Sequence, residues 1–428
     1  MRIVSRFDLF WEGAVALSFL LPLTACHLRR EVMAASLAEP AAGISLYDGV
    51  VTLNPVTRQT TARWSIAFRR QPGVDSVSLL LNSGLTIRSV TGSSVLKFDT
   101  ARDDDLTRLI VHFRSSQGAQ ATRFDVVYDG ALTMSGDSIN IVSPEWIELS
   151  LDTFWHPVFA DLSQAILGRV RVVLPTGFRA VSSGALTAHG DTLEIVNTAP
   201  LVDFAFAASP HLVSSAFNRA RAFYVGDPPA KVTELLNVAN ACVDDLNAQF
   251  GAHTPLMQVD MVLPPRPGPG YARKRYIAIS RGSNTTPERM TWFICHELAH
   301  NWTLGAVASG PENWLNEGFA EYVSGRAVRR IYGDTAYSAV LGHWRQQAAG
   351  QPPVWRPTFT ARPGARVAYG KAPLLLDSLE HRIGVPNMDR MLVRFMTERL
   401  RTTPDVLTML TAIAGLETSE WFRLVLSR

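Results

Sequence analysis

The segment His296-Glu297-Leu298-Ala299-His300, followed by Glu317, constrains this chain more than any other feature. On a helix, positions i and i+4 share one face, so His296 and His300 can direct two imidazoles at one metal ion. Glu317 supplies a third ligand from further along the chain. Two histidines and one glutamate with an open fourth position form the ligand set of a catalytic zinc, whereas structural zinc sites are closed.

The neighbours of these ligands are candidates for the remaining chemistry. Glu297 can take a proton from a water that zinc has made acidic and can hand it to a leaving amine. Glu321 lies one turn beyond Glu317 and either accepts a hydrogen bond from a ligand histidine or is a solvated helix charge. Asn316 either orients Glu317 or ends a turn. Tyr369 could donate its phenol to an oxyanion, although a tyrosine at a helix start more often only packs.

Composition indicates a globular protein of two or three domains. The 428 residues are 47% hydrophobic and 18% charged, and the net charge is +3. So small a charge argues against a nucleic-acid partner. The three cysteines are too few for a disulfide framework. Cys242 and Cys295 could pair, but Cys295 directly precedes His296 in a probable helix, so we expect two buried free thiols.

The N-terminus is typical of an exported protein. Arg2 and Arg6 precede an apolar stretch that is too short to span a bilayer comfortably and ends Leu23-Thr24-Ala25-Cys26. This ending resembles a bacterial lipobox, so we expect a signal peptide over residues 1–26, a lipidated Cys26 and membrane attachment through it. An ordinary cleaved signal, or a misassigned start, would explain the same residues. Residues 27–43 are expected to be a tether.

The remainder divides into three predicted regions. Residues 44–214 read as an all-β sandwich, with strands expected at Leu106–Phe113, Arg123–Tyr128, Arg169–Leu174, Thr192–Val196 and Val202–Ala207. Residues 215–334 alternate helices and strands and carry the zinc motif. Their expected elements are a helix from Asp227 to Gly251, strands at Met257–Leu263 and Tyr276–Ser280, and a helix from Thr286 to Gly305. Residues 335–428 read as helices, including Ala372–Ile383 and Met388–Leu400.

Two longer segments resemble gluzincin metallopeptidases of the aminopeptidase N and leukotriene hydrolase family. The first runs from His296 to Trp302, and the second is Trp314-Leu315-Asn316-Glu317-Gly318-Phe319-Ala320-Glu321-Tyr322. Tyr369-Gly370-Lys371 resembles the motif in which the family's tyrosine stabilises the oxyanion. The resemblance implies a multidomain α+β fold: a β-sandwich, a thermolysin-like zinc catalytic domain and a short helical C-terminal part. It also implies one zinc ion and a peptide substrate.

The chain departs from the family in three places. The gap between His300 and Glu317 is two residues shorter than usual, and the helical tail is short. Where family aminopeptidases carry a glutamate that binds the substrate α-amine, this chain has Arg273-Lys274-Arg275. Three bases would repel an ammonium group, so we hypothesise that a free N-terminus is not required and that acidic or internal segments are accepted. The alternative is a solvated loop that faces away from the site.

The sequence therefore favours a zinc metallopeptidase of the cell envelope. Two other functions stay open: a non-peptide zinc hydrolase, and an envelope binding or assembly module that keeps zinc for its structure. The presence of both Glu297 and Tyr369 argues against a purely structural zinc. Composition and motifs leave the oligomeric state undetermined.

Overall fold

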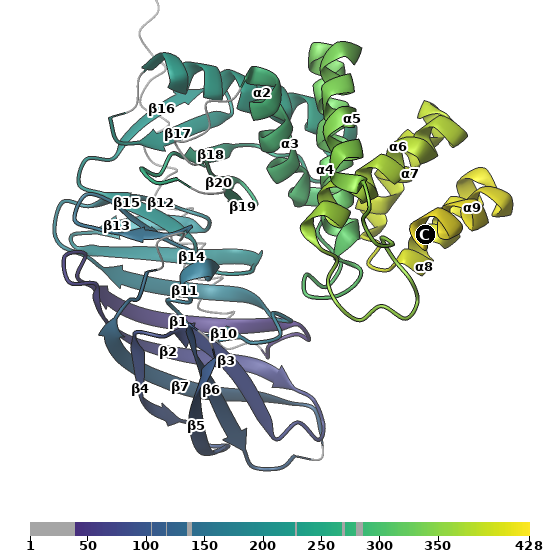
Figure 1. Ribbon diagram of the computed structural model, residues 1–428. Helices are drawn as coiled ribbons and strands as arrows, with labels where there is room; N and C mark the ends of the chain where they lie inside the picture. Colours follow the sequence, from purple (N-terminus) through teal and green to yellow (C-terminus); the bar gives the residue numbers. More distant parts are fainter. Residues whose placement is uncertain are drawn as a thin grey trace, which may run out of the picture.

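The computed structural model describes residues 39–428 except 104, 117, 135–138, 227–228, 268–269 and 280–285. The predicted signal peptide with Cys26, and the tether as far as residue 38, lie outside the described residues. Within them, no helix is both long and apolar enough to cross a membrane. Figure 1 shows a β-rich half that passes into a helical half, with the sheet of β16 to β20 between them.

The N-terminal half is built from three sheets. The seven-stranded sheet has the order β13 (Ala185–His189), β14 (Thr192–Leu201), β11 (Ala165–Val173), β1 (Ile44–Leu53), β2 (Gln59–Arg70), β7 (Gln120–Ala131) and β4 (Leu85–Thr91). A four-stranded sheet has the order β10 (Val158–Phe159), β3 (Ser76–Asn82), β6 (Leu106–Phe113) and β5 (Val95–Asp103). A third sheet has the order β12 (Arg179–Ser182), β15 (Phe206–Ser209), β9 (Ile147–Leu149) and β8 (Ile141–Val142), and the short turn η1 (Leu151–Thr153) follows β9.

Alternating burial explains why these strands form a sandwich. In β1 and β2, buried and exposed residues alternate along most of each strand, as expected where one face meets a core. Trp64 of the large sheet and Leu79 and Leu109 of the second sheet lie in the same core, and all three are fully buried. The predicted all-β sandwich is confirmed, and the strand expected at Leu106–Phe113 is β6 with the same bounds.

The predicted catalytic region and the C-terminal residues combine a mixed sheet with a series of helices. The sheet has the order β16 (Val213–Phe217), β17 (Ala220–Tyr224), β18 (Val259–Val262), β20 (Tyr276–Ala278) and β19 (Tyr271–Arg273). The helices are α2 (Pro229–Phe250), α3 (Pro287–Thr303), α4 (Asn313–Tyr332), α5 (Asp334–Ala348), the π-helical turn η2 (Val367–Lys371), α6 (Ala372–Ile383), α7 (Val385–Glu398), α8 (Thr403–Ala414) and α9 (Leu416–Leu426). The multidomain α+β fold is confirmed.

One hydrophobic core joins the sheet of the catalytic region to the C-terminal helices. It includes Ala220 on β17, Ile294 on α3, Leu376 on α6 and Leu426 at the end of α9. The predicted division between residues 334 and 335 therefore separates segments that share a core. The predicted boundary at residue 214 falls within β16, which pairs with β17 of the catalytic sheet.

The β-sandwich and the catalytic sheet meet through a smaller cluster and two ion pairs. The cluster packs Trp146, Val181, Ala205, Ala207 and Leu212 against Val262, Tyr271, Tyr276 and Ala278. Arg266, in the Pro-rich loop before β19, donates to both carboxylate oxygens of Glu148 at 2.6 and 2.7 Å. Arg273 on β19 donates to Asp203 at 2.8 Å. The edge strand β19 is thus held from the N-terminal half.

The expectation of two free thiols is wrong. Cys242 on α2 and Cys295 on α3 form a disulfide, and both residues are fully buried. The helical position of Cys295 does not prevent pairing, because α2 packs directly against α3 and brings the two Cα atoms to 5.2 Å. This bond crosslinks α2 to the residue that immediately precedes His296.

Candidate metal centre and active site

Helix α3 positions the two histidines. Thr286 caps its N-terminus by accepting from the backbone N–H of Arg289 at 3.5 Å, and Pro287 occupies the first turn. Met290, Ile294 and Leu298 give the helix a buried face. His296 and His300 lie one turn apart on the side facing α4, with ring centroids 4.9 Å apart.

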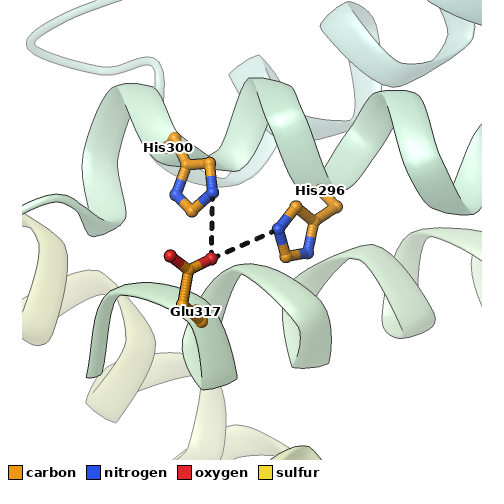
Figure 2. A group of neighbouring side chains, drawn as sticks. All are labelled: His296, His300 and Glu317. Carbon is orange, nitrogen blue, oxygen red and sulfur yellow. Dashed lines mark ion pairs between the residues drawn. The ribbon is translucent and has the colours of Figure 1, made fainter. Parts of the chain in front are cut away.

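Helix α4 brings Glu317 between the two imidazoles (Figure 2). Oε2 of Glu317 lies 3.6 Å from Nε2 of His296 and 3.4 Å from Nε2 of His300. Two ligand atoms on a tetrahedral zinc with bonds of about 2.0–2.1 Å are about 3.3–3.4 Å apart. The spacing and the donor types therefore fit zinc, and the three predicted ligands are brought together from two packed helices.

Asn316 holds the short connection between the two ligand helices. Its Oδ1 accepts from the backbone N–H groups of Gly305 and Ala306 at 3.0 and 3.1 Å, and its Nδ2 donates to the carbonyl of Ala306 at 3.0 Å. These bonds fix the loop after α3 to the first turn of α4. The three predicted ligands therefore come together although the gap is two residues shorter than usual.

Glu321 supports His296 from outside the ligand set. Its Oε2 lies 2.8 Å from Nδ1 of His296, and its Oε1 accepts from Nε1 of Trp344 on α5 at 3.0 Å. Burial alone would lower the pKa of His296, but Glu317 and Glu321 outweigh it and raise that pKa to about 10 when no metal competes. The bond to Nδ1 leaves Nε2 directed at Glu317, which is the tautomer that a metal ligand requires.

Glu297 and Tyr369 lie on the wall of one cavity with the three ligands. The cavity has a volume of about 960 Å³ and is lined by residues of both halves of the molecule, among them Val202, Tyr271 and Phe293. The ring of Tyr369 lies 5.5 Å from that of His296, measured between centroids. Burial, together with the nearby carboxylate of Glu317, raises the pKa of Tyr369 above its usual range. The phenol therefore keeps its proton and can donate it in a hydrogen bond.

The turn η2 carries Tyr369 and is fixed on two sides. Gly370 packs so closely on Gln347 of α5 that an added Cβ would collide with the Cβ of that residue. Lys371 donates to the backbone carbonyls of Gln351, Pro352 and Arg428 at 2.8–3.0 Å. A π-helical turn at a functional residue is a recurrent feature, because the extra residue redirects one side chain.

The three basic residues before β20 do not act as one group. Arg273 is largely buried and ion-pairs with Asp203 at 2.8 Å, with Asp152 3.9 Å away. Arg275 lies 3.8 Å from Asp260 on β18. Lys274, in the turn between β19 and β20, lines the cavity together with Arg273. The charge of Arg273 is thus balanced within the protein, which leaves Lys274 as the member best placed to meet a substrate.

Two contacts of the site were not predicted from the sequence. Trp344 reaches Glu321 from α5, and Arg362 places Nη2 3.5 Å from Oε1 of Glu317. No local motif marks either residue. A tryptophan in an amphipathic helix and an arginine in a loop are common, and only the packing of α5 and of the segment before η2 brings them to the ligands.

Comparisons with known proteins agree on one family. Residues 236–353 match the model of the peptidase family M1 domain. Aminopeptidase 2 of Candida albicans is 30% identical over 110 residues, which cover 23% of this chain and 12% of that protein. The chain therefore aligns with only a small part of this curated relative.

Solved structures are similar over most of the chain. An M1 zinc metallopeptidase from Deinococcus radiodurans superposes with a TM-score of 0.69 at 18% identity, covering 91% of this chain and 95% of that one. Leukotriene A4 hydrolase from Saccharomyces cerevisiae gives a TM-score of 0.70 at 14% identity, covering 90% of this chain and 68% of that one. At these identities the likeness concerns the fold.

Proposed function

We propose that this chain is an aminopeptidase-like zinc metallopeptidase of the M1 type, which hydrolyses peptide bonds with one zinc ion per chain. The match of residues 236–353 to the M1 domain and the similar fold of an M1 enzyme support this proposal. The observation that carries the proposal is the grouping of three zinc-type ligands, a carboxylate and a protonated phenol around one cavity. A zinc that served only the structure would need neither Glu297 nor Tyr369.

The proposed mechanism assigns a separate task to each side chain. A zinc ion held by His296, His300 and Glu317 would polarise the scissile carbonyl and make the attacking water acidic. Glu297, on the turn of α3 that carries His296, takes the proton of that water and passes it to the leaving amine. Tyr369 donates its phenol O–H to the oxyanion that develops on the carbonyl.

The substrate is proposed to be a peptide or protein segment with apolar side chains near the cleaved bond. The cavity wall is mainly apolar, with Met290, Phe293 and Leu304 from α3 and the residue after it. A related M1 enzyme from Deinococcus radiodurans has been solved with the peptide Tyr-Ser-Ala bound. We propose that a free N-terminus is not required, because the positive charge of Lys274 on the cavity wall would repel an ammonium group. An unchanged cleavage pattern in Lys274→Ala would show that this residue does not recognise the substrate.

The test is cleavage of a mixed peptide library, read by mass spectrometry, with Glu297→Gln as the blank. We expect cuts that depend on Glu297, because loss of a general base costs about 10²–10⁴-fold in rate. Tyr369→Phe should lower the rate by about 10²–10³-fold while zinc stays bound. Cuts inside N-terminally blocked peptides would exclude a strict aminopeptidase, whereas cuts at free N-termini alone would refute the hypothesis about the basic segment.

The same library separates the competing functions. If a zinc-loaded chain makes no Glu297-dependent cut, peptide hydrolysis is refuted and two functions remain. Hydrolysis of a non-peptide ester, amide or epoxide probe would then indicate another zinc hydrolase. Zinc that stays bound while such probes remain intact would indicate a binding or assembly module.

We also propose that the protein is exported to the cell envelope and attached to a membrane through lipidated Cys26. The disulfide between Cys242 and Cys295 supports export, since such bonds persist in oxidising compartments. Mass spectrometry of the N-terminal peptide should find a lipid on Cys26, and Cys26→Ser should release the protein from membranes. An unmodified Cys26 in the membrane fraction would contradict the anchor.

A further inference from the structure

The charged side chains that line the cavity differ in whether a group of opposite charge within the protein pairs with them. Among the described lining residues, Glu317 is a metal ligand, Glu321 is bonded to His296 and Trp344, and Asp152 lies 3.9 Å from the guanidinium of Arg273. Glu297 is the remaining carboxylate, and it is needed as the base. Among the basic lining residues, Arg273 is neutralised by Asp203, and Lys274, Arg289 and Arg362 line the cavity as well.

Arg362 is the basic residue next to the reacting centre. It lies in the segment between α5 and η2, seven positions before Tyr369, and lines the same cavity. Its Nη2 is 3.5 Å from Oε1 of Glu317, the oxygen that faces away from the two histidines. Its side chain is nevertheless 50% exposed. The guanidinium therefore touches a ligand on one side and the open cavity on the other.

The partners of Arg362 within the protein leave part of its hydrogen-bonding capacity free. When the amide oxygen of Asn313 faces it, that oxygen accepts from Nε at 3.1 Å and from Nη2 at 3.3 Å. Among the described residues, no group bonds to Nη1, which carries two further N–H donors. Glu317 is also a predicted metal ligand, so among the described residues no other carboxylate is left to balance the charge of Arg362.

We propose that Arg362 binds a carboxylate of the substrate beside the scissile bond. The inference rests on the proposed peptidase function and narrows its substrates to peptides that carry an anionic group at this position. Arginine suits the task because its planar fork matches the two oxygens of a carboxylate. The carboxylate could come from an aspartate or glutamate side chain or from the C-terminus of a short peptide.

Binding to an inactive chain tests the inference without relying on turnover. The zinc-loaded Glu297→Gln protein is titrated calorimetrically with two pairs of peptides. Acetyl-Phe-Asp-amide and acetyl-Phe-Asn-amide compare a side-chain carboxylate with its amide. Acetyl-Phe-Ala with a free C-terminus and its C-terminal amide compare a terminal carboxylate in the same way. The pair that shows a preference identifies the source of the carboxylate.

We expect the acid to bind about tenfold or more tightly than the amide in at least one pair, as for a charge-assisted hydrogen bond. Adding Arg362→Met should reduce this ratio to within about twofold, and Arg362→Lys should keep part of it. Arg366→Met is the matched control, because Arg366 is an exposed arginine four positions along the same segment and should leave the ratio unchanged. Zinc content is measured for every variant.

Several outcomes would overturn the inference. One is equal binding of acid and amide in both pairs, and another is an acid preference that persists in Arg362→Met. A loss of zinc in Arg362→Met with an unchanged ratio would make the arginine a support of Glu317 only. Binding of none of the four peptides by a chain that cleaves the library would also refute it. Acid-selective binding without any library cleavage would instead refute the peptidase and leave Arg362 as an anion-binding residue.

Discussion

The carboxylate of Glu321 links a metal ligand to a helix that supplies no ligand of its own. One oxygen orients His296, and the other accepts from Trp344 on α5. Both Glu321 and Trp344 are buried, so neither bond can be replaced readily by water. The orientation of the predicted ligand His296 is therefore set partly by α5. This helix packs against α4 at the point where Gly325 closely approaches Trp344.

Replacing Glu321 should weaken the metal site without removing a ligand. We expect Glu321→Gln to lower zinc affinity about 10–100-fold, because the partner of a ligand histidine fixes its tautomer and raises its basicity. Competition with a chromogenic chelator measures the change. Glu420→Gln is the matched control, since Glu420 is half exposed on α9 and pairs with Arg423. Equal zinc affinity in the two variants would show that Glu321 has no such role.

Sequence patterns predicted the ligand set because it depends on local spacing. The i and i+4 histidines and the Thr286 cap lie within one helix, and the glutamate follows at the start of the next. The pairing of Arg273 was not predicted, because its partner, Asp203, is 70 residues upstream in the other half of the molecule. Contacts of this kind become visible only when the sheets are in place.

At the scale of elements, the position of η2 depends on Gly370, which packs closely against α5. An alanine at position 370 would collide with Gln347 of α5, so the turn or the helix must move. We expect Gly370→Ala to lower kcat about tenfold or more, since small displacements of a catalytic group are costly. The zinc content should not change, because α3 and α4 hold the ligands. Steady-state kinetics with metal analysis would check this.

A glycine in the preceding loop provides the control for that substitution. A Cβ added at Gly364 would meet no atom within 4 Å, so Gly364→Ala should keep the parent kcat. If both variants behaved alike, the position of Tyr369 would not depend on the packing of η2 against α5.

The bond between α2 and α3 should stabilise the catalytic region. It closes a loop with a sequence separation of 53 residues, for which loop entropy predicts about 4 kcal/mol. We expect the variant with Cys242→Ser and Cys295→Ser to unfold at lower urea concentration, measured by circular dichroism. Cys26→Ser should unfold like the parent. An unchanged midpoint in the double variant would mean that the crosslink does not contribute to stability.

The bond between Cys242 and Cys295 could not be predicted from the positions of the cysteines in the sequence. Cys295 was predicted to be in a helix, and it is. Whether a helical cysteine forms a bond depends on what packs on its face, and the packing of α2 on α3 is a tertiary contact. Local elements such as β6 and α6 matched their predicted bounds because strand alternation and the glycine after Ile383 are local signals.

At the scale of the whole molecule, the buried pair of Glu148 and Arg266 joins the two halves. Both side chains are almost fully buried, and their two hydrogen bonds connect β9 to the loop before the edge strand β19. Burial raises the pKa of Glu148, and Arg266 opposes that shift. A substitution on one side would leave the other charge buried without a partner.

We therefore expect Glu148→Gln to lower the free energy of unfolding by about 3–5 kcal/mol. Asp125→Asn is the control, because its partner Arg63 is 71% exposed and such surface pairs contribute less than about 1 kcal/mol. Urea unfolding of the two variants gives the comparison. Similar midpoints would show that the interface between the halves does not depend on this pair.

The single core that runs from β17 to α9 has a consequence for how activity is lost. The predicted ligands on α3 and α4 and the phenol on η2 are carried by elements that contribute to this one core. Among the described residues, none of these groups lies on a separate unit that could detach and leave the others intact. Heating should therefore abolish hydrolysis and melt the C-terminal helices in one cooperative step. A fragment cut before η2 would keep all three predicted ligands and still lack Tyr369, the group proposed to stabilise the oxyanion.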